Sequence, residues 1–206
     1  MIVIVDYGVG NLKSVHKALE RIGAEAAVSS DPASLDAARG IVLPGVGAFG
    51  DAMKNLTRRG LAAPVLDQVR RGKPLLGICL GMQLLFDESE EMGRHQGLGL
   101  LPGNVVRFPD ATLTVPHVGW NQLRRTSSPS ASPILDGIPD GAYAYFVHSY
   151  YVAPEEAGDV AATTEYGPEF ASVVRRGSIW GAQFHPEKSQ EVGLTLLENY
   201  VRLVRS

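Results

Sequence analysis

Short apolar segments alternate with amphipathic helical patterns through the first half of this chain, and this alternation limits the possible folds more than any other feature. The apolar segments are Ile2–Val5, Ala26–Val28, Ile41–Leu43 and Leu75–Ile78. Helical spacing is found at 12–22, at 51–71 with a break near Gly60, and at 80–90. Strands that alternate with helices are typical of a parallel sheet covered by helices on both faces.

The second half changes character and predicts mainly strands joined by short turns. These are Val105–Phe108, Tyr143–Val152, Val160–Glu165, Ala171–Arg175 and Ile179–Phe184, followed by a closing helix over 190–204. We expect antiparallel additions to the same sheet and a single α/β domain over residues 1–206. The low-complexity stretch Thr126–Pro133 predicts a surface loop.

Composition excludes several classes of function. The net charge of −3 does not favour a nucleic-acid partner, and a single cysteine excludes an internal disulfide or a multi-cysteine zinc site. No apolar run approaches the length of a membrane span, and the first residues lack the basic start of a signal peptide. We therefore expect a cytoplasmic protein with no metal or cofactor and no membrane or nucleic-acid partner.

The segment Gly77–Gly81, with sequence GICLG, lies between an apolar strand and an amphipathic segment. This context is that of a nucleophile elbow with cysteine as the nucleophile, in which glycines permit a sharp turn. It would hold the Cys79 sulfur at the carboxyl end of a strand, where ligands bind in open α/β sheets. A lone cysteine is otherwise a small core residue, and that alternative stays open at this point.

A second candidate is His185 with Glu187, at the end of another apolar strand. Alternate residues of a strand point the same way, so the carboxylate can orient the imidazole. An isolated His-Pro-Glu is typical of a surface turn, but with Cys79 it completes a nucleophile, a base and an orienting acid.

The third candidate is the glycine loop that begins at Pro44 and Gly45. A backbone N–H of this loop, near Val46, and the N–H of Leu80 could form an oxyanion hole. Residues 45–50 also match G-x-G-x-x-G, the pattern of a dinucleotide-binding turn, but the expected acid about twenty residues later is absent.

Three further segments have a structural and a functional interpretation. Gln83 follows Cys79 by one helical turn and could point into the same pocket or into solvent. The segment His148–Tyr150 fits an ordinary buried strand. The segment Pro116–Asn121 carries an aromatic residue outside any helix, which is more typical of an interface than of catalysis.

Together these residues resemble the class I, triad-type glutamine amidotransferases. Within that class, six segments resemble the glutaminase subunits of imidazole glycerol phosphate synthases. They are DYGVGNLKSV (6–15), PGVGAFGDAM (44–53), GICLGMQLLF (77–86), PHVGWN (116–121), YFVHSY (145–150) and QFHPEKS (183–189). The resemblance covers essentially the whole chain and implies the α/β fold of that class, with a central, mostly parallel sheet.

The resemblance implies that Cys79 attacks the side-chain amide of glutamine, with His185 as base and Glu187 as its orienting acid. It places the oxyanion against Val46 and Leu80, and glutamine against Gly45, Gly47, Gln83, His148, Ser149 and Tyr150. It also implies a (β/α)₈-barrel cyclase subunit as partner in a heterodimer, met near Asn11, Trp120, Asn121, Tyr145 and Lys188. Ammonia would pass to the cyclase, whose products in histidine biosynthesis are imidazole glycerol phosphate and an aminoimidazole carboxamide ribonucleotide.

Alternatives from other classes remain at this point. One is a stand-alone cysteine hydrolase or the glutaminase subunit of another amidotransferase. A second is a nucleotide-binding module based on Gly45–Gly50, and a third is a regulatory subunit without activity.

Overall fold

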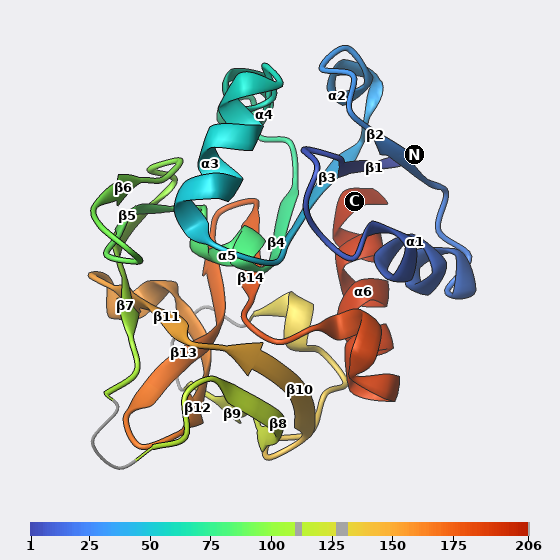
Figure 1. Cartoon of the computed structure of the whole chain (residues 1–206). Coiled ribbons are helices and arrows are strands. Elements are labelled where there is room, and N and C mark those ends of the chain that lie inside the picture. The colour runs from blue at the N-terminus through green and yellow to red at the C-terminus, as the bar shows by residue number, and fades with distance from the viewer. Residues whose placement is uncertain (110–112, 127–131, 206) are drawn as a thin grey trace.

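The computed structural model describes residues 1–109, 113–126 and 132–205. Its main sheet has eight strands in the order β2-β1-β3-β4-β14-β13-β12-β9 (Figure 1). The strands are β1 (Ile2–Val5), β2 (Ala26–Ser29), β3 (Gly40–Gly45), β4 (Leu75–Cys79), β14 (Ile179–Ala182), β13 (Glu169–Arg176), β12 (Val160–Glu165) and β9 (Arg124–Arg125). Strands β2, β1, β3, β4 and β14 pair in parallel, and β13, β12 and β9 extend the sheet in antiparallel fashion.

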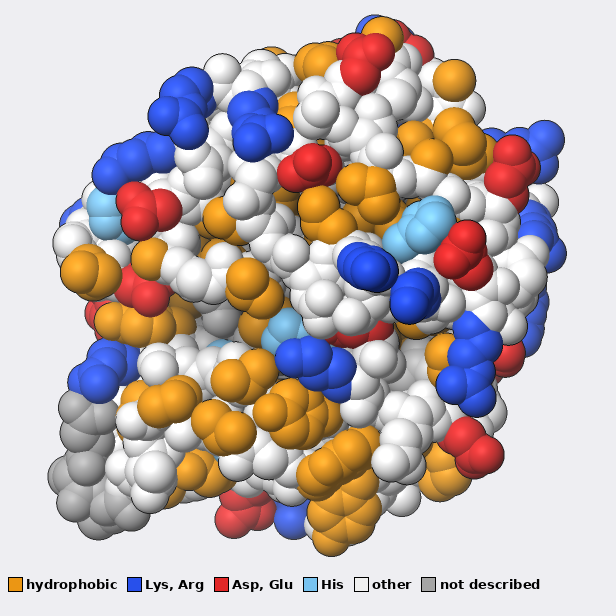
Figure 2. Space-filling model, turned by 45° about the vertical axis from the view of Figure 1, so that its right-hand side comes forward, with side chains coloured by type: hydrophobic (Ala, Val, Ile, Leu, Met, Phe, Trp, Pro, Cys, Tyr) orange, Lys and Arg blue, Asp and Glu red, His pale blue; other side chains and the backbone are white. Residues whose placement is uncertain are grey.

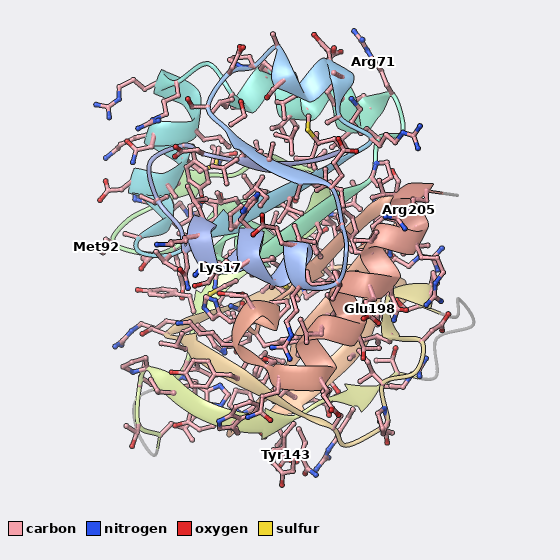
Figure 3. The ribbon with its side chains drawn as sticks, turned by 90° about the vertical axis from the view of Figure 1, so that its right-hand side faces the viewer. Lys17, Arg71, Met92, Tyr143, Glu198 and Arg205 are labelled. Atoms are coloured by element: carbon pink, nitrogen blue, oxygen red, sulfur yellow. The ribbon has the colours of Figure 1, made fainter. Side chains whose placement is uncertain are left out.

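The helices cover both faces of the parallel part. They are α1 (Leu12–Arg21), α2 (Ser34–Ala37), α3 (Phe49–Arg58), α4 (Ala62–Arg70), α5 (Leu80–Gln83) and α6 (Gln190–Arg205). Helices α1 and α6 lie side by side over one face (Figure 3), and α2, α3 and α4 cover the other (Figure 1). Strand β1 shows why: Ile2 and Ile4 join one apolar cluster, and Val3 and Val5 join the other. The predicted α/β class is confirmed.

Two smaller sheets complete the fold beside the main one. One pairs β8 (His117–Gln122) with β10 (Tyr143–His148). The other has the order β11-β7-β5-β6, formed by β11 (Tyr150–Pro154), β7 (Leu101–Arg107), β5 (Phe86–Ser89) and β6 (His95–Gln96). The second half of the chain therefore adds four strands to the main sheet, the parallel β14 and the antiparallel β13, β12 and β9. The two smaller sheets were not predicted from the sequence.

Two predicted elements are wrong in extent. The helix expected over 80–90 ends after one turn, because the carbonyls of Leu84 and Leu85 accept backbone hydrogen bonds from Leu98 and Leu100 and the chain continues as β5. The single strand expected over 143–152 is two strands in different sheets, divided at Ser149. Of the loop predicted at Thr126–Pro133, residues 127–131 lie outside the described part of the chain.

Candidate active site

Cys79 occupies a sharp turn between β4 and α5. Its backbone angles are φ 54° and ψ −114°, a region that residues other than glycine seldom adopt and that costs about 1–3 kcal/mol. The two flanking glycines make the turn possible. A Cβ on Gly77 would come within 2.8 Å of the carbonyl oxygen of Gly81, and a Cβ on Gly81 would collide with the carbonyl of Leu43. The fold thus holds the sulfur at the carboxyl end of β4, as the elbow pattern predicts.

His185 reaches the same end of the sheet because β14 pairs in parallel with β4, with Ala182 opposite Ile78. Nδ1 of His185 lies 2.8 Å from Oε1 of Glu187, and both side chains are almost completely buried. The two residues belong to a turn, with Glu187 in the 3₁₀ segment Pro186–Lys188, and not to a strand as the sequence suggested. Ser189 fixes this turn by donating from Oγ to the carbonyl of His185 at 2.7 Å.

The electrostatics of His185 depend on its two neighbours. Burial lowers its pKa, but interactions with Cys79 and Glu187 outweigh burial and raise the pKa to about 10. Nε2 makes no hydrogen bond of regular geometry within the described residues, although the thiol is close enough to act on the ring. The imidazole is therefore fixed at Nδ1 by the carboxylate and keeps Nε2 for proton exchange beside the sulfur.

The predicted oxyanion loop lies directly beside Cys79. In the pairing of β3 with β4, Gly45 is opposite Cys79. Gly45 has no room for a side chain, because a Cβ there would lie 2.6 Å from the hydroxyl of Tyr7 and 2.9 Å from the amide nitrogen of Gly81. Tyr7 in turn donates to the carbonyl of Pro44 at 2.7 Å. The loop is tightly packed at Gly45, whereas the next residue, Val46, is 42% exposed.

A pocket of about 340 Å³ joins these elements. Its size is near the lower end for small-molecule sites. The residues that line it are Val46, Gly47, Cys79, Leu80, Gln83, Glu91, Pro116, Val147, His148, Ser149, Tyr150 and His185. The structure thus brings together five of the six predicted glutamine contacts. The sixth, Gly45, lies behind the lining, where it packs against Tyr7 and Gly81.

Two polar residues of this site were not predicted. Glu91 lines the pocket and accepts a hydrogen bond at Oε2 from the backbone nitrogen of Phe49 at 2.6 Å. Gln183 is fully buried, and its Nε2 lies 3.8 Å from Sγ of Cys79. Glu91 lies just after the helix predicted over 80–90, which ends after one turn in the structure. Gln183 is the first residue of the segment QFHPEKS, but its position directly after an apolar strand indicates no role for it.

A chain of neutral side chains links the pocket to the surface. Nδ1 of His148 lies 2.8 Å from the carbonyl oxygen of Tyr150, and its Nε2 lies 3.2 Å from Nδ1 of His117. Nε2 of His117 lies 3.3 Å from the side-chain amide of Asn121. Burial lowers the pKa of His117 to about 4 and that of His148 to about 3. Because the Tyr150 carbonyl can only accept, each ring donates from Nδ1 and accepts at Nε2.

The predicted partner contacts fall mostly on one exposed face. Trp120 lies edge-on to Tyr145 with 6.0 Å between ring centroids, and the ammonium of Lys188 lies 5.6 Å from the Tyr145 ring. Figure 2 shows hydrophobic side chains gathered on the lower half of one side of the molecule. Trp120 and its neighbours Val118 and Tyr143 are each about half exposed, and Tyr143 projects from the lower end in Figure 3. Asn11 lies elsewhere, at the start of α1, where its side chain forms no capping hydrogen bond.

Comparison with known proteins agrees with this geometry. Residues 3–203 match the family model described as glutamine amidotransferase class-I. The chain belongs to the class-I glutamine amidotransferases. Similar proteins include "Imidazole glycerol phosphate synthase subunit HisH" of Geobacillus kaustophilus, 56% identical over 98% of this chain and 96% of the relative. The protein of the same name from Syntrophotalea carbinolica is 53% identical over 97% and 98% of the two chains.

Solved structures show the same amidotransferase fold at low identity. A "Crystal structure of glutamine amidotransferase" superposes with a TM-score of 0.77 at 22% identity, covering both chains completely. "Structure of PurLQS from Thermotoga maritima" gives a TM-score of 0.75 at 20% identity, with 99% of this chain and 96% of that chain covered. Within the described residues of this amidotransferase, no helix is long and apolar enough to span a membrane, and no cluster of His, Cys, Asp and Glu could hold a metal ion.

Proposed function

We propose that this protein hydrolyses glutamine to glutamate and ammonia as the glutaminase subunit of an imidazole glycerol phosphate synthase. The observation that carries the proposal is the convergence of Cys79 and the His185–Glu187 pair on one pocket of about 340 Å³. Relatives more than 50% identical over nearly their whole length are named as that subunit.

The reaction follows from the position of each group. Sγ of Cys79, whose proton is held on Nε2 of His185, attacks the side-chain amide carbon of glutamine. His185 then gives that proton to the leaving nitrogen, and ammonia departs from a glutamyl thioester on Cys79. Water, activated by the same imidazole, attacks the thioester and releases glutamate and the free thiol. Glu187 keeps the imidazole aligned in both steps.

The negative oxygen that develops in each step needs donors that are already in place. The backbone N–H of Leu80 immediately follows the nucleophile, and the N–H of Val46 belongs to the loop beside it. Loss of one such donor typically lowers the rate ~10²–10³-fold. We assign the oxyanion to these two groups. The exposure of Val46 makes this loop the part of the site most open to adjustment by a partner.

The charged end of glutamine requires separate contacts. Among the described residues that line the pocket, Glu91 supplies the carboxylate, and it suits the substrate's ammonium group. The side-chain NH₂ of Gln83 points inward and donates to the Tyr150 carbonyl and to the Gln183 side chain. The Oε1 of Gln83 can therefore accept a hydrogen bond from the same ammonium group. The turn His148–Tyr150, with Gly47, would enclose the rest of the substrate.

The partner is a (β/α)₈-barrel cyclase subunit that takes up the ammonia and forms imidazole glycerol phosphate and an aminoimidazole carboxamide ribonucleotide. Trp120, Tyr145 and Lys188 support this assignment, because exposed aromatic rings beside a cation are typical of binding hot spots. Asn121 and Asn11 would add contacts at other positions, since the Asn121 side chain faces His117 on the opposite side of β8 from Trp120 and Asn11 lies at the start of α1. The complex would act in the cytoplasm.

The test measures glutamate release from glutamine by the purified chain, alone and with its cyclase and the cyclase's ribonucleotide ligand. We expect low activity alone, a large rise with both, and no activity from a Cys79→Ala variant in any condition. Equal activity with and without the cyclase would point to a self-sufficient hydrolase. Activity that survives in Cys79→Ala would refute the mechanism itself.

A further inference from the structure

Gln183 is a fully buried amide whose side chain lies beside the nucleophile, and the mechanism above does not use it. The residue is completely inaccessible to solvent and follows β14 directly, two positions before His185. Its backbone nitrogen donates to the carbonyl of Ser172 at 2.9 Å, which fixes where the side chain starts. Its Nε2 is 3.8 Å from Sγ of Cys79, within the range of a hydrogen bond to sulfur.

The orientation of this amide is determined by a chain of contacts that starts at a backbone carbonyl. The carbonyl oxygen of Tyr150 can only accept, so the group of Gln83 that lies 2.9 Å from it must be the NH₂. The same NH₂ lies 3.1 Å from the Gln183 side chain, so that atom of Gln183 must be its carbonyl oxygen. The NH₂ of Gln183 is then the end that faces Cys79.

Resting on the proposed glutaminase function, we infer that Gln183 donates a hydrogen bond to the Cys79 sulfur and favours its ionised, attacking form. A donor that approaches a thiolate stabilises the charge, and an amide can neither take the thiol proton nor compete with His185 for it. Gln83 is a positioning residue in this arrangement. The NH₂ of Gln83 holds the Gln183 side chain in place by donating to its Oε1. The Oε1 of Gln83 remains available for the substrate.

The chain's single cysteine provides a direct test that does not depend on glutamine turnover. Any alkylation by iodoacetamide must occur at Cys79, so its rate between pH 5 and 10, followed by mass spectrometry, reports the reactive thiolate alone. The variants are Gln183→Met, which keeps the length without the donor, and Gln183→Glu, which keeps the shape but exchanges the donor for a charge. Gln68→Met is the matched control, because Gln68 is also buried but belongs to α4.

We expect the alkylation rate at pH 7 to fall about tenfold in Gln183→Met, the usual effect of losing one hydrogen bond to a charged group. Gln183→Glu should react more slowly still, because a carboxylate repels the thiolate. Gln68→Met should keep the profile of the unmodified protein. Gln83→Met, which loosens Gln183 without removing it, should shift the profile in the same direction but less.

Two results would overturn the inference. One is an unchanged profile in Gln183→Met. The other is the reverse order, with Gln183→Glu faster than Gln183→Met, because that order indicates that only the shape of the side chain matters. Glutamine hydrolysis by the unmodified chain with its cyclase is measured separately. If it is absent while the alkylation order holds, the proposed function fails and the role of Gln183 stands.

Discussion

Acid should destabilise this protein through two buried histidines. His117 and His148 are 3% and 6% exposed, stack among aromatic rings and are hydrogen-bonded to each other. Their pKa values are about 4 and about 3, below the value of about 6.5 for an exposed histidine. At pH values between the folded and the unfolded pKa, these two histidines bind more protons in the unfolded chain than in the folded one. Stability therefore falls as the pH drops below 6.5.

The size of the effect follows from the width of that window. From pH 6.5 to pH 5 each buried histidine stays neutral while its unfolded counterpart becomes charged. This costs ~1.4 kcal/mol per pH unit, or ~2 kcal/mol for each histidine. The pair should therefore remove ~4 kcal/mol from the free energy of unfolding between pH 7 and pH 5. That is a large share of the ~5–15 kcal/mol typical of a folded protein.

Urea denaturation at pH 7 and pH 5, followed by circular dichroism, measures this loss. In His117→Gln one proton site is gone, so the loss should be ~2 kcal/mol smaller than in the unmodified chain. Asn121→Ala is the control, since it removes the outer hydrogen bond of the chain without removing a proton site. It should lower stability equally at both pH values. An identical acid loss in His117→Gln and the unmodified protein would refute the reasoning.

Three further changes have clear expected outcomes. Gly81→Ala should lower the free energy of unfolding by at least ~3 kcal/mol in thermal and urea denaturation, because its Cβ would collide with the backbone carbonyl of Leu43. Glu187→Gln should reduce glutamine turnover in the cyclase complex ~10²-fold and lower the pH at which His185 titrates, as NMR can follow. Trp120→Ala should weaken cyclase binding by ~2 kcal/mol in calorimetry and leave alkylation of Cys79 unchanged.

Local patterns identified the parts of the fold and site that depend on neighbouring residues. The buried strands β1, β3 and β4 are short apolar runs, and the elbow at Cys79 is a run of five consecutive residues. The sequence correctly predicts that Glu187 contacts His185, but the predicted geometry is wrong. Their spacing was interpreted as strand alternation, whereas a 3₁₀ turn brings the two side chains together.

The missed features depend on contacts between distant parts of the chain. Residues 80–90 carry leucines at helical spacing, but the carbonyls of residues 84–86 pair with the backbone of residues 98–101. These backbone hydrogen bonds end the helix, and the chain that follows brings Glu91 to the pocket. Gln183 meets Cys79 only because β14 inserts beside β4, more than a hundred residues later in the chain. Neither pairing has a local signal.

The turn at Ser149 shows how these distant contacts select the groups that can bind substrate. Here the chain leaves the sheet of β10 and enters that of β11, and His148, Ser149 and Tyr150 line the pocket. The carbonyl of Tyr150 accepts from Gln83 at 2.9 Å and from His148 at 2.8 Å, which occupies both of its lone pairs. A substrate ammonium group would find no free lone pair there. In the proposed reaction this group therefore binds to Glu91 and to Oε1 of Gln83, while the turn shapes the wall against which the substrate lies.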